Sequence, residues 1–265
     1  MYPFLTLWGV KVYMTGLGIV VALFTFLAVA RFLCKQYKLD FRKLFYRFPT
    51  LLIVTYLLGS YAYLLIEKGV WFPLSSLSNL KAWLSPYGYK FHFVWVAIGI
   101  IRSVRRFFKK LVVGSEKLKW IDLFFFATSS ALIPMGVFFV LGDTIIGRPA
   151  PFSSMGISDL TPGGVSELSK YGKVFPVGIF MSIISLFSYG ITFVGKAITK
   201  RPGRGYIGFG ILLLLFNIVF SYQLYPRHGV LPIFWLSLDV KNFVAIITGV
   251  ICLIIGIRIL KRPTA

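Results

Sequence analysis

Long apolar runs that alternate with short basic connectors are the feature that most constrains the fold of this chain. A helix needs about 20 mainly apolar residues to cross the hydrocarbon of a bilayer. Seven segments approach or exceed that length, at about residues 10–33, 49–66, 89–108, 121–146, 174–195, 206–224 and 242–260. Only 14% of the 265 residues are charged, against about 25% in soluble domains. We therefore predict an all-α integral membrane protein with a single transmembrane domain over residues 1–265.

The basic residues determine the predicted orientation. Segments 31–47, 102–119, 196–204 and 258–262 hold 20 of the 29 Lys and Arg residues. If all seven segments cross, these four patches lie on one side of the membrane, and basic loops face the cytoplasm. The third segment has the weakest signal, since its apolar run from Phe91 to Ile101 is only eleven residues long. If it did not cross, the patch at 102–119 would lie outside. The sequence thus predicts seven transmembrane helices with the N-terminus outside and the C-terminus in the cytoplasm.

The formal net charge of +21 does not predict a nucleic-acid partner. The Lys and Arg residues fall in short patches between apolar runs, where they meet anionic lipid headgroups. A nucleic-acid reader would gather them on one soluble face of a recognisable fold, and no soluble stretch here is long enough to fold alone. We therefore predict a membrane-embedded protein with no nucleic-acid partner.

The two cysteines, Cys34 and Cys252, predict neither a disulfide framework nor a metal site, because both fall in or beside apolar helices and neither has ligand spacing. No phosphate-binding loop, dinucleotide fingerprint or zinc motif is present. We expect no cofactor and no metal. The first apolar run is too long for a signal peptide, and its basic cluster follows it, so we expect it to be the first transmembrane helix.

Three outer connections follow from this orientation. Residues 67–90 contain the amphipathic stretch LSSLSNLKAWL with flanking Trp and Tyr residues, a pattern typical of a short helix lying in the membrane interface. Residues 147–173 are rich in Gly, Ser and Pro, and form the longest external connection. Residues 225–241 include the apolar run PIFWL and predict a second segment at the interface.

Polar groups at membrane depth are energetically costly and are candidates for function. His92 begins the third helix at its outer end and could accept a proton, or it could bond to backbone or headgroup. Asp143 and Arg148 flank the outer end of the fourth helix. The planar guanidinium suits a phosphate, but the two residues could equally form a structural pair that closes the helix.

Further polar residues lie within the predicted helices. Tyr13 and Tyr61, with Tyr63, fall in helices one and two, and Asn217 falls in helix six. Each could bind a ligand in a central cavity, although hydrogen bonds between helices are the commoner use. The Ser and Thr residues are expected to permit close helix packing: Thr128, Ser129, Ser130, Ser182, Ser185 and Ser188. Asp122 is expected to cap or anchor the fourth helix.

The order of several motifs resembles that of bacterial prolipoprotein diacylglyceryl transferase. The resemblance is collinear over almost the whole chain. It rests on the first helix VYMTGLGIVVALFTFLAVA (12–30), on LLGSYAYLLIE (57–67), on SNLKAWLSPYGYKFHF (78–93), on the spacing from Ile121-Asp122-Leu123 to Gly147-Arg148-Pro149, and on RPGRGYIGFGILLLLF (201–216).

The resemblance implies a seven-helix enzyme of the bacterial inner membrane. Such an enzyme moves a diacylglyceryl group from phosphatidylglycerol to the cysteine thiol of a lipobox-bearing prolipoprotein. His92 matches the family's essential His, Tyr13 its first-helix Tyr and Arg148 the Arg of its Gly-Arg-Pro, which makes these three the candidate catalytic residues. The candidate substrate-binding residues are Asp143, Lys90, Tyr61 and Asn217.

The chain departs from the family pattern in the fourth and later helices. An ungapped alignment puts Gly136 at a signature Arg, Phe139 at an Asn and Thr144 at a Glu. With a gap, Gly147-Arg148 could instead stand for the signature's own Gly-Arg. These departures leave two alternatives open: a non-catalytic membrane subunit or lipid-binding scaffold on the same fold, and an unrelated small transporter.

Overall fold

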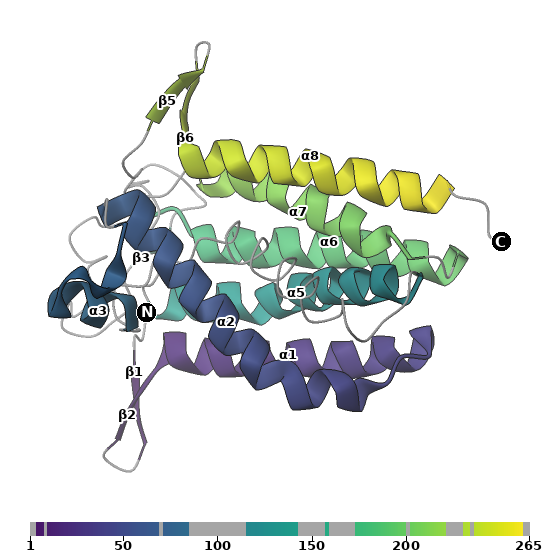
Figure 1. The fold of residues 1–265 in the computed structure, drawn as a ribbon, viewed down its shortest axis with the longest axis horizontal. Helices are drawn as coiled ribbons and strands as arrows, with labels where there is room; N and C mark the ends of the chain where they lie inside the picture. The colour runs from purple at the N-terminus through teal and green to yellow at the C-terminus, as the bar shows by residue number, and fades with distance from the viewer. Residues whose placement is uncertain are drawn as a thin grey trace. The chain divides into compact units, whose positions relative to one another are not determined.

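The computed structural model describes residues 4–7, 10–68, 71–84, 115–142, 157–158, 173–199, 202–220, 230–233 and 236–261. Over these residues the protein is all-α, with seven α-helices (Figure 1). The helices are α1 (Met14–Tyr37), α2 (Phe41–Lys68), α3 (Leu77–Leu84), α5 (Ser115–Leu141), α6 (Val177–Thr199), α7 (Arg204–Phe220) and α8 (Val240–Lys261).

The remaining elements are short. A 3-10 helix, η1 (Pro73–Ser75), precedes α3. Three antiparallel strand pairs occur among the described residues: β1 (Phe4–Leu7) with β2 (Val10–Tyr13), β3 (Ile157–Ser158) with β4 (Lys173–Val174), and β5 (Val230–Ile233) with β6 (Leu236–Asp239).

Three of the described helices are long and apolar enough to cross a membrane. They cover Met14–Tyr37, Leu118–Leu141 and Val177–Val194. The predictions of an all-α protein and of long membrane-crossing helices are confirmed to this extent. The third predicted span, at 89–108, lies outside the described residues.

The observed helices differ from the predicted spans mainly at their ends. The first span was predicted from residue 10, but residues 10–13 form strand β2 and α1 begins at Met14. The prediction that Tyr13 lies within a helix was therefore wrong. The strand ladder from Phe4 to Tyr13 satisfies backbone hydrogen bonds, and this pairing replaces the first helical turn. Helix α2 begins at Phe41, eight residues before the predicted span.

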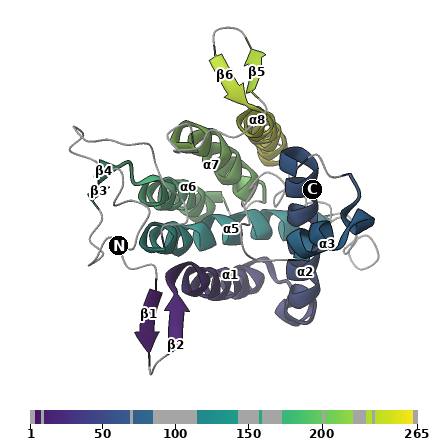
Figure 2. The same cartoon turned by 90° about the vertical axis from the view of Figure 1, so that its left-hand side faces the viewer.

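The chain divides into two compact units. Unit 1 comprises the described residues of 1–33, 122–226 and 246–265, and unit 2 comprises those of 34–121 and 227–245. Unit 1 therefore contains most of α1, α5 and α8 together with the whole of α6 and α7, and these helices run side by side (Figure 2).

Helix α5 is antiparallel to both α1 and α6 in unit 1. The start of α1 lies against the end of α5, where a Cβ on Gly142 would lie 2.9 Å from the Thr15 nitrogen. Further along, the Phe26 and Phe124 rings are 5.8 Å apart. Helix α6 runs opposite to α5, since Ser182 donates to the Ile133 carbonyl at 2.7 Å whereas the later Tyr189 meets the earlier Phe126, with ring centroids 4.8 Å apart.

Helix α7 runs parallel to α5 and antiparallel to α8. The Phe125 and Phe209 rings stack with centroids 4.5 Å apart. A Cβ on Gly210 would lie 2.8 Å from the Gly249 carbonyl oxygen, so the two backbones touch at this crossing. Small residues that let backbones approach in this way are typical of helix packing in membranes.

The turn from α1 to α2 belongs to unit 2 and shows why the helices end where they do. Lys38 adopts a positive φ of 57°, and the Leu39 amide donates to the Cys34 carbonyl at 2.8 Å. This hydrogen bond is typical of a helix that ends in a left-handed residue. Asp40 then caps α2, since its Oδ1 accepts the Arg42 amide hydrogen at 3.0 Å.

Candidate functional site

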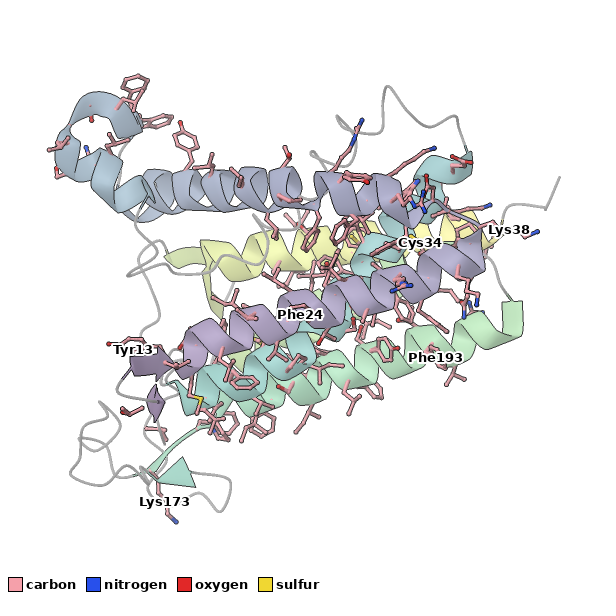
Figure 3. All side chains as sticks on the ribbon, turned by 90° about the horizontal axis from the view of Figure 1, so that it is seen from below. Tyr13, Phe24, Cys34, Lys38, Lys173 and Phe193 are labelled. Carbon is pink, nitrogen blue, oxygen red and sulfur yellow. The ribbon has the colours of Figure 1, made fainter. Side chains whose placement is uncertain are left out.

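Of the three candidate catalytic residues, the structure describes only Tyr13. Tyr13 is the last residue of β2 and stands immediately before α1, with 56% of its surface exposed. It lies at the same end of unit 1 as Lys173 (Figure 3). His92 and Arg148 lie outside the described residues, so their placement beside Tyr13 stays a prediction.

Among the candidate substrate-binding residues, Tyr61 is described and is engaged locally. Its hydroxyl donates to the Trp71 carbonyl at 3.0 Å, which ties the C-terminal part of α2 to the segment that follows this helix. Asn217 lies in α7, but its side chain is outside the described part of the structure. Asp143 and Lys90 are also outside the described residues.

Asp122 is the buried carboxylate among the described residues of unit 1, and it anchors α5, as predicted, but does not cap this helix. It lies inside α5, whose first residue is Ser115, and only 1% of its surface is exposed. Its Oδ1 accepts the amide hydrogens of Gly203 at 2.9 Å and Gly205 at 2.6 Å. Asp122 therefore satisfies free amides at the N-terminus of α7 rather than capping its own helix.

Two backbone features explain why glycines meet Asp122. Gly203 has a φ of +111°, a conformation that favours glycine. A Cβ on Gly205 would collide with the Asp122 backbone. The Pro-Gly-Arg-Gly sequence at 202–205 thus lets α5 and the start of α7 approach closely enough for one carboxylate oxygen to accept two amides.

The buried hydroxyls serve packing, as predicted for the Ser and Thr residues. Ser182 bonds across to α5 through the Ile133 carbonyl, and Ser188 donates to the Gly208 carbonyl of α7. Ser185 instead donates to the Met181 carbonyl of its own helix at 2.7 Å. In each of these bonds the hydroxyl donates its single proton to a backbone carbonyl.

Helix α6 has its polar and apolar faces reversed relative to a helix of a water-soluble protein. Its buried residues include Ser182, Ser185, Ser188 and Thr192. Its exposed face carries large apolar residues: Ile179, Ile183, Leu186, Phe187, Ile191, Phe193 and Val194. Phe193 and Phe24 of α1 project from the bundle (Figure 3). Such a surface suits hydrocarbon and is unfavourable in water.

Helices α5 and α6 cross closely at a pair of glycines. Gly136 of α5 crosses Gly178 of α6, and a Cβ on Gly178 would lie 2.5 Å from the Gly136 carbonyl oxygen. A Cβ on Gly136 would collide with the Gly178 carbonyl and with Ser182. Phe139, one turn further along α5, is 3% exposed. No side chain larger than hydrogen fits at Gly136 in this arrangement.

The two ends of unit 1 differ in charge. The end where α7 begins and α1 and α8 finish carries most of the basic positions that the structure describes in this unit: Arg31, Lys196, Arg204, Arg258 and Lys261. The opposite end, where α1 and α6 begin, carries Lys11 and Lys173. We refer to these as the basic end and the Tyr13 end.

The fold and surface define a class of protein. The three candidate spans, together with the exposed apolar face of α6, indicate a multi-pass membrane protein. Comparison of the chain with protein-family models, curated proteins and solved structures gave no match.

Proposed function

We propose that this chain crosses the bacterial inner membrane seven times, with the N-terminus outside and the C-terminus in the cytoplasm. The helix directions in unit 1 support this topology. Helix α1 leaves unit 1 and α5 enters it at the same end, the basic end. The chain between them must therefore cross an even number of times. If α2 crosses, a second crossing must follow before α5, and the run predicted at 89–108 is the available segment.

The charge asymmetry of unit 1 supports the direction of threading. The packing of the helices places the basic positions Arg31, Arg204 and Arg258 at one end of unit 1. This grouping follows from the helix contacts alone and assumes no membrane. Basic loops favour the cytoplasmic side. With the basic end inside, the Tyr13 end faces outward.

Within this topology we propose that the protein transfers a diacylglyceryl group from phosphatidylglycerol to a lipobox cysteine. The observation that carries the proposal is the position of Tyr13 at the end opposite the basic end. Arg148 follows Gly142 by six residues, so chain length keeps it within about 20 Å of Gly142. Gly142 lies against Thr15, two residues from Tyr13. Connectivity thus allows Arg148 to reach the neighbourhood of Tyr13.

The proposed chemistry assigns one role to each residue. His92 accepts the thiol proton, because the thiolate is the competent nucleophile. The sulfur attacks the glycerol carbon that carries the phosphate ester, so a C–S bond forms and a C–O bond breaks. The electron pair leaves on the glycerol phosphate, whose charge Arg148 stabilises. Tyr13 donates a hydrogen bond to the same phosphate.

A non-catalytic lipid-binding relative is the second candidate, and one observation favours it. The crossing of Gly136 and Gly178 occupies the position of a family cation. A chain that has lost this cation could keep the fold and the lipid contacts without turnover.

Complementation of a conditional transferase-deficient bacterium separates the two candidates. We expect growth with the unmodified protein, loss of growth with His92→Ala or Arg148→Ala, and growth with the matched control His228→Ala. Membrane levels of each variant are checked by immunoblot. Failure of the unmodified protein would favour the non-catalytic relative, and growth with both site variants would refute the assigned residues.

A further inference from the structure

The segment that joins α2 to α3 presents a cluster of exposed apolar side chains. Trp71, Phe72, Leu74 and Leu77 have 78%, 62%, 59% and 69% of their surfaces exposed. We call these four residues the turn patch. They lie within seven consecutive positions of unit 2, and large aromatic and aliphatic groups grouped in this way on a surface mark a site of interaction.

Several polar groups beneath the turn patch have partners within the segment. Ser76 caps α3, with its Oγ accepting the Asn79 amide hydrogen at 3.1 Å. The Ser75 amide donates to the Phe72 carbonyl at 3.1 Å. The Asn79 side chain donates to the Ser75 Oγ at 3.0 Å. Backbone groups that have hydrogen-bond partners within the segment cost less free energy to transfer into the membrane interface than groups without partners.

A further hydrogen bond connects the turn to α2. The Tyr61 hydroxyl donates to the Trp71 carbonyl, so the start of the turn is attached to the helix that precedes it. The turn patch is thus held in a defined shape close to the end of a 28-residue helix.

The sequence around the turn patch is basic on balance. The nearest charged residues are Glu67, Lys68 and Lys81, and Lys90 follows, with no further Asp or Glu before Glu116. Lys side chains attract anionic phospholipid headgroups. Trp and Phe beside Lys are characteristic of chains at the boundary between headgroup and acyl chain.

We propose that the turn patch is inserted at the headgroup–acyl boundary of the outer leaflet and fixes the outer end of α2 in an anionic lipid surface. Trp71, Phe72, Leu74 and Leu77 enter the acyl region, and the Ser and Asn side chains that cap α3 face the headgroups. The assignment to the outer leaflet rests on the proposed topology, whereas the insertion itself does not depend on catalysis.

The test compares two neighbouring exposed residues of α3. Leu77→Cys belongs to the turn patch, and Ser78→Cys is the matched control. Each full-length variant, with Cys34 and Cys252 replaced by Ala, carries an NBD fluorophore at the new thiol and is reconstituted in vesicles of phosphatidylglycerol and phosphatidylcholine. Trp71→Cys provides a second patch position in case Leu77→Cys fails to fold.

We expect a lipid with a doxyl group high on its acyl chain to quench the Leu77→Cys fluorophore at least about twofold more than the Ser78→Cys fluorophore. Aqueous iodide should show the reverse order. Iodide quenching of both positions alike would place the turn patch in water and overturn the proposal. A blue-shifted signal that neither reagent quenches would show a protein or a second copy covering the turn patch, which also overturns it.

Right-side-out membrane vesicles separate this proposal from the proposed function. Externally added dithionite should bleach the Ser78→Cys fluorophore. Bleaching only after the vesicles are opened would place the turn patch in the inner leaflet and contradict the proposed orientation. A failure of complementation with intact doxyl quenching would instead refute catalysis alone.

Discussion

Helices α5 and α6 are both long and apolar, yet they use their surfaces in different ways. In α5, 67% of the candidate span is buried, against 39% in α6. The central helix carries the buried carboxylate Asp122, whereas the peripheral helix buries hydroxyls and exposes Ile, Leu and Phe. The polar groups described in unit 1 are therefore concentrated where helices meet, and the apolar groups cover the outer surface.

This comparison bears directly on function. A transferase site needs cations and proton acceptors that are free to meet substrate. In the described residues of α5 and α6, Asp122, Ser182 and Ser188 have partners in the neighbouring helices. Tyr13, the described member of the proposed catalytic residues, stands before α1 and outside both of these helices, with 56% of its surface exposed.

The largest expected effect comes from breaking the contact between the two helices. Gly136→Leu should destabilise the fold by more than about 3 kcal/mol, because overpacking against a backbone carbonyl cannot be relieved by a side-chain rotation. The matched control is Gly190→Leu in α6, where a Cβ meets nothing within 4 Å. Thermal unfolding in detergent measures both. Equal melting temperatures would show that the Gly136–Gly178 crossing is absent.

Removing the carboxylate of α5 should have the next largest effect. Asp122→Ala leaves the Gly203 and Gly205 amides buried without this acceptor, and we expect a loss of about 2–3 kcal/mol. Asp40→Ala is the control, since it removes an exposed cap of α2 and should cost about 1 kcal/mol. The free energy of unfolding is measured for both variants. Equal losses would contradict the claim that the buried hydrogen bonds of Asp122 stabilise the fold more than an exposed cap does.

The sequence predicted much of the fold because apolar length and charge position are local properties. The runs at 14–37, 118–141 and 177–194 are long and apolar enough to be identified as spans without knowing which helices they contact. The predicted packing role of the hydroxyls was also correct for Ser182 and Ser188, since small polar residues in a span seldom have another use.

What the sequence did not reveal depends on contacts between distant residues. Asp122 and Gly203 are 81 positions apart, and no periodicity indicates their hydrogen bond. The Gly136–Gly178 crossing likewise needs two helices in register. Tyr13 was assigned to a helix because the first span was predicted to begin at residue 10, whereas pairing with β1 determines its conformation. Of the candidate site, only Tyr13 and Tyr61 have described side chains, so its assembly stays a prediction.

The smallest expected effect on stability comes from removing single hydroxyls of α6. Ser188→Ala removes a hydrogen bond to the Gly208 carbonyl of α7 and should cost about 0.6 kcal/mol, the usual size for such bonds within membranes. Ser185→Ala removes a bond within α6 itself and should change stability less. The free energy of unfolding in mixed micelles is the measurement, and a larger loss for Ser185→Ala would contradict the assignment of Ser188 to the α6–α7 contact.

The most direct test of the central account is the side of the membrane on which each end of unit 1 lies. Lys173 and Lys261 are both exposed and mark the Tyr13 end and the basic end. In intact cells a membrane-impermeant maleimide should label the Lys173→Cys variant and leave Lys261→Cys unlabelled until the cells are opened, with the unmodified chain as the control for its buried Cys34 and Cys252. Labelling of Lys261→Cys in intact cells would contradict the proposed threading and the outward-facing site built on it.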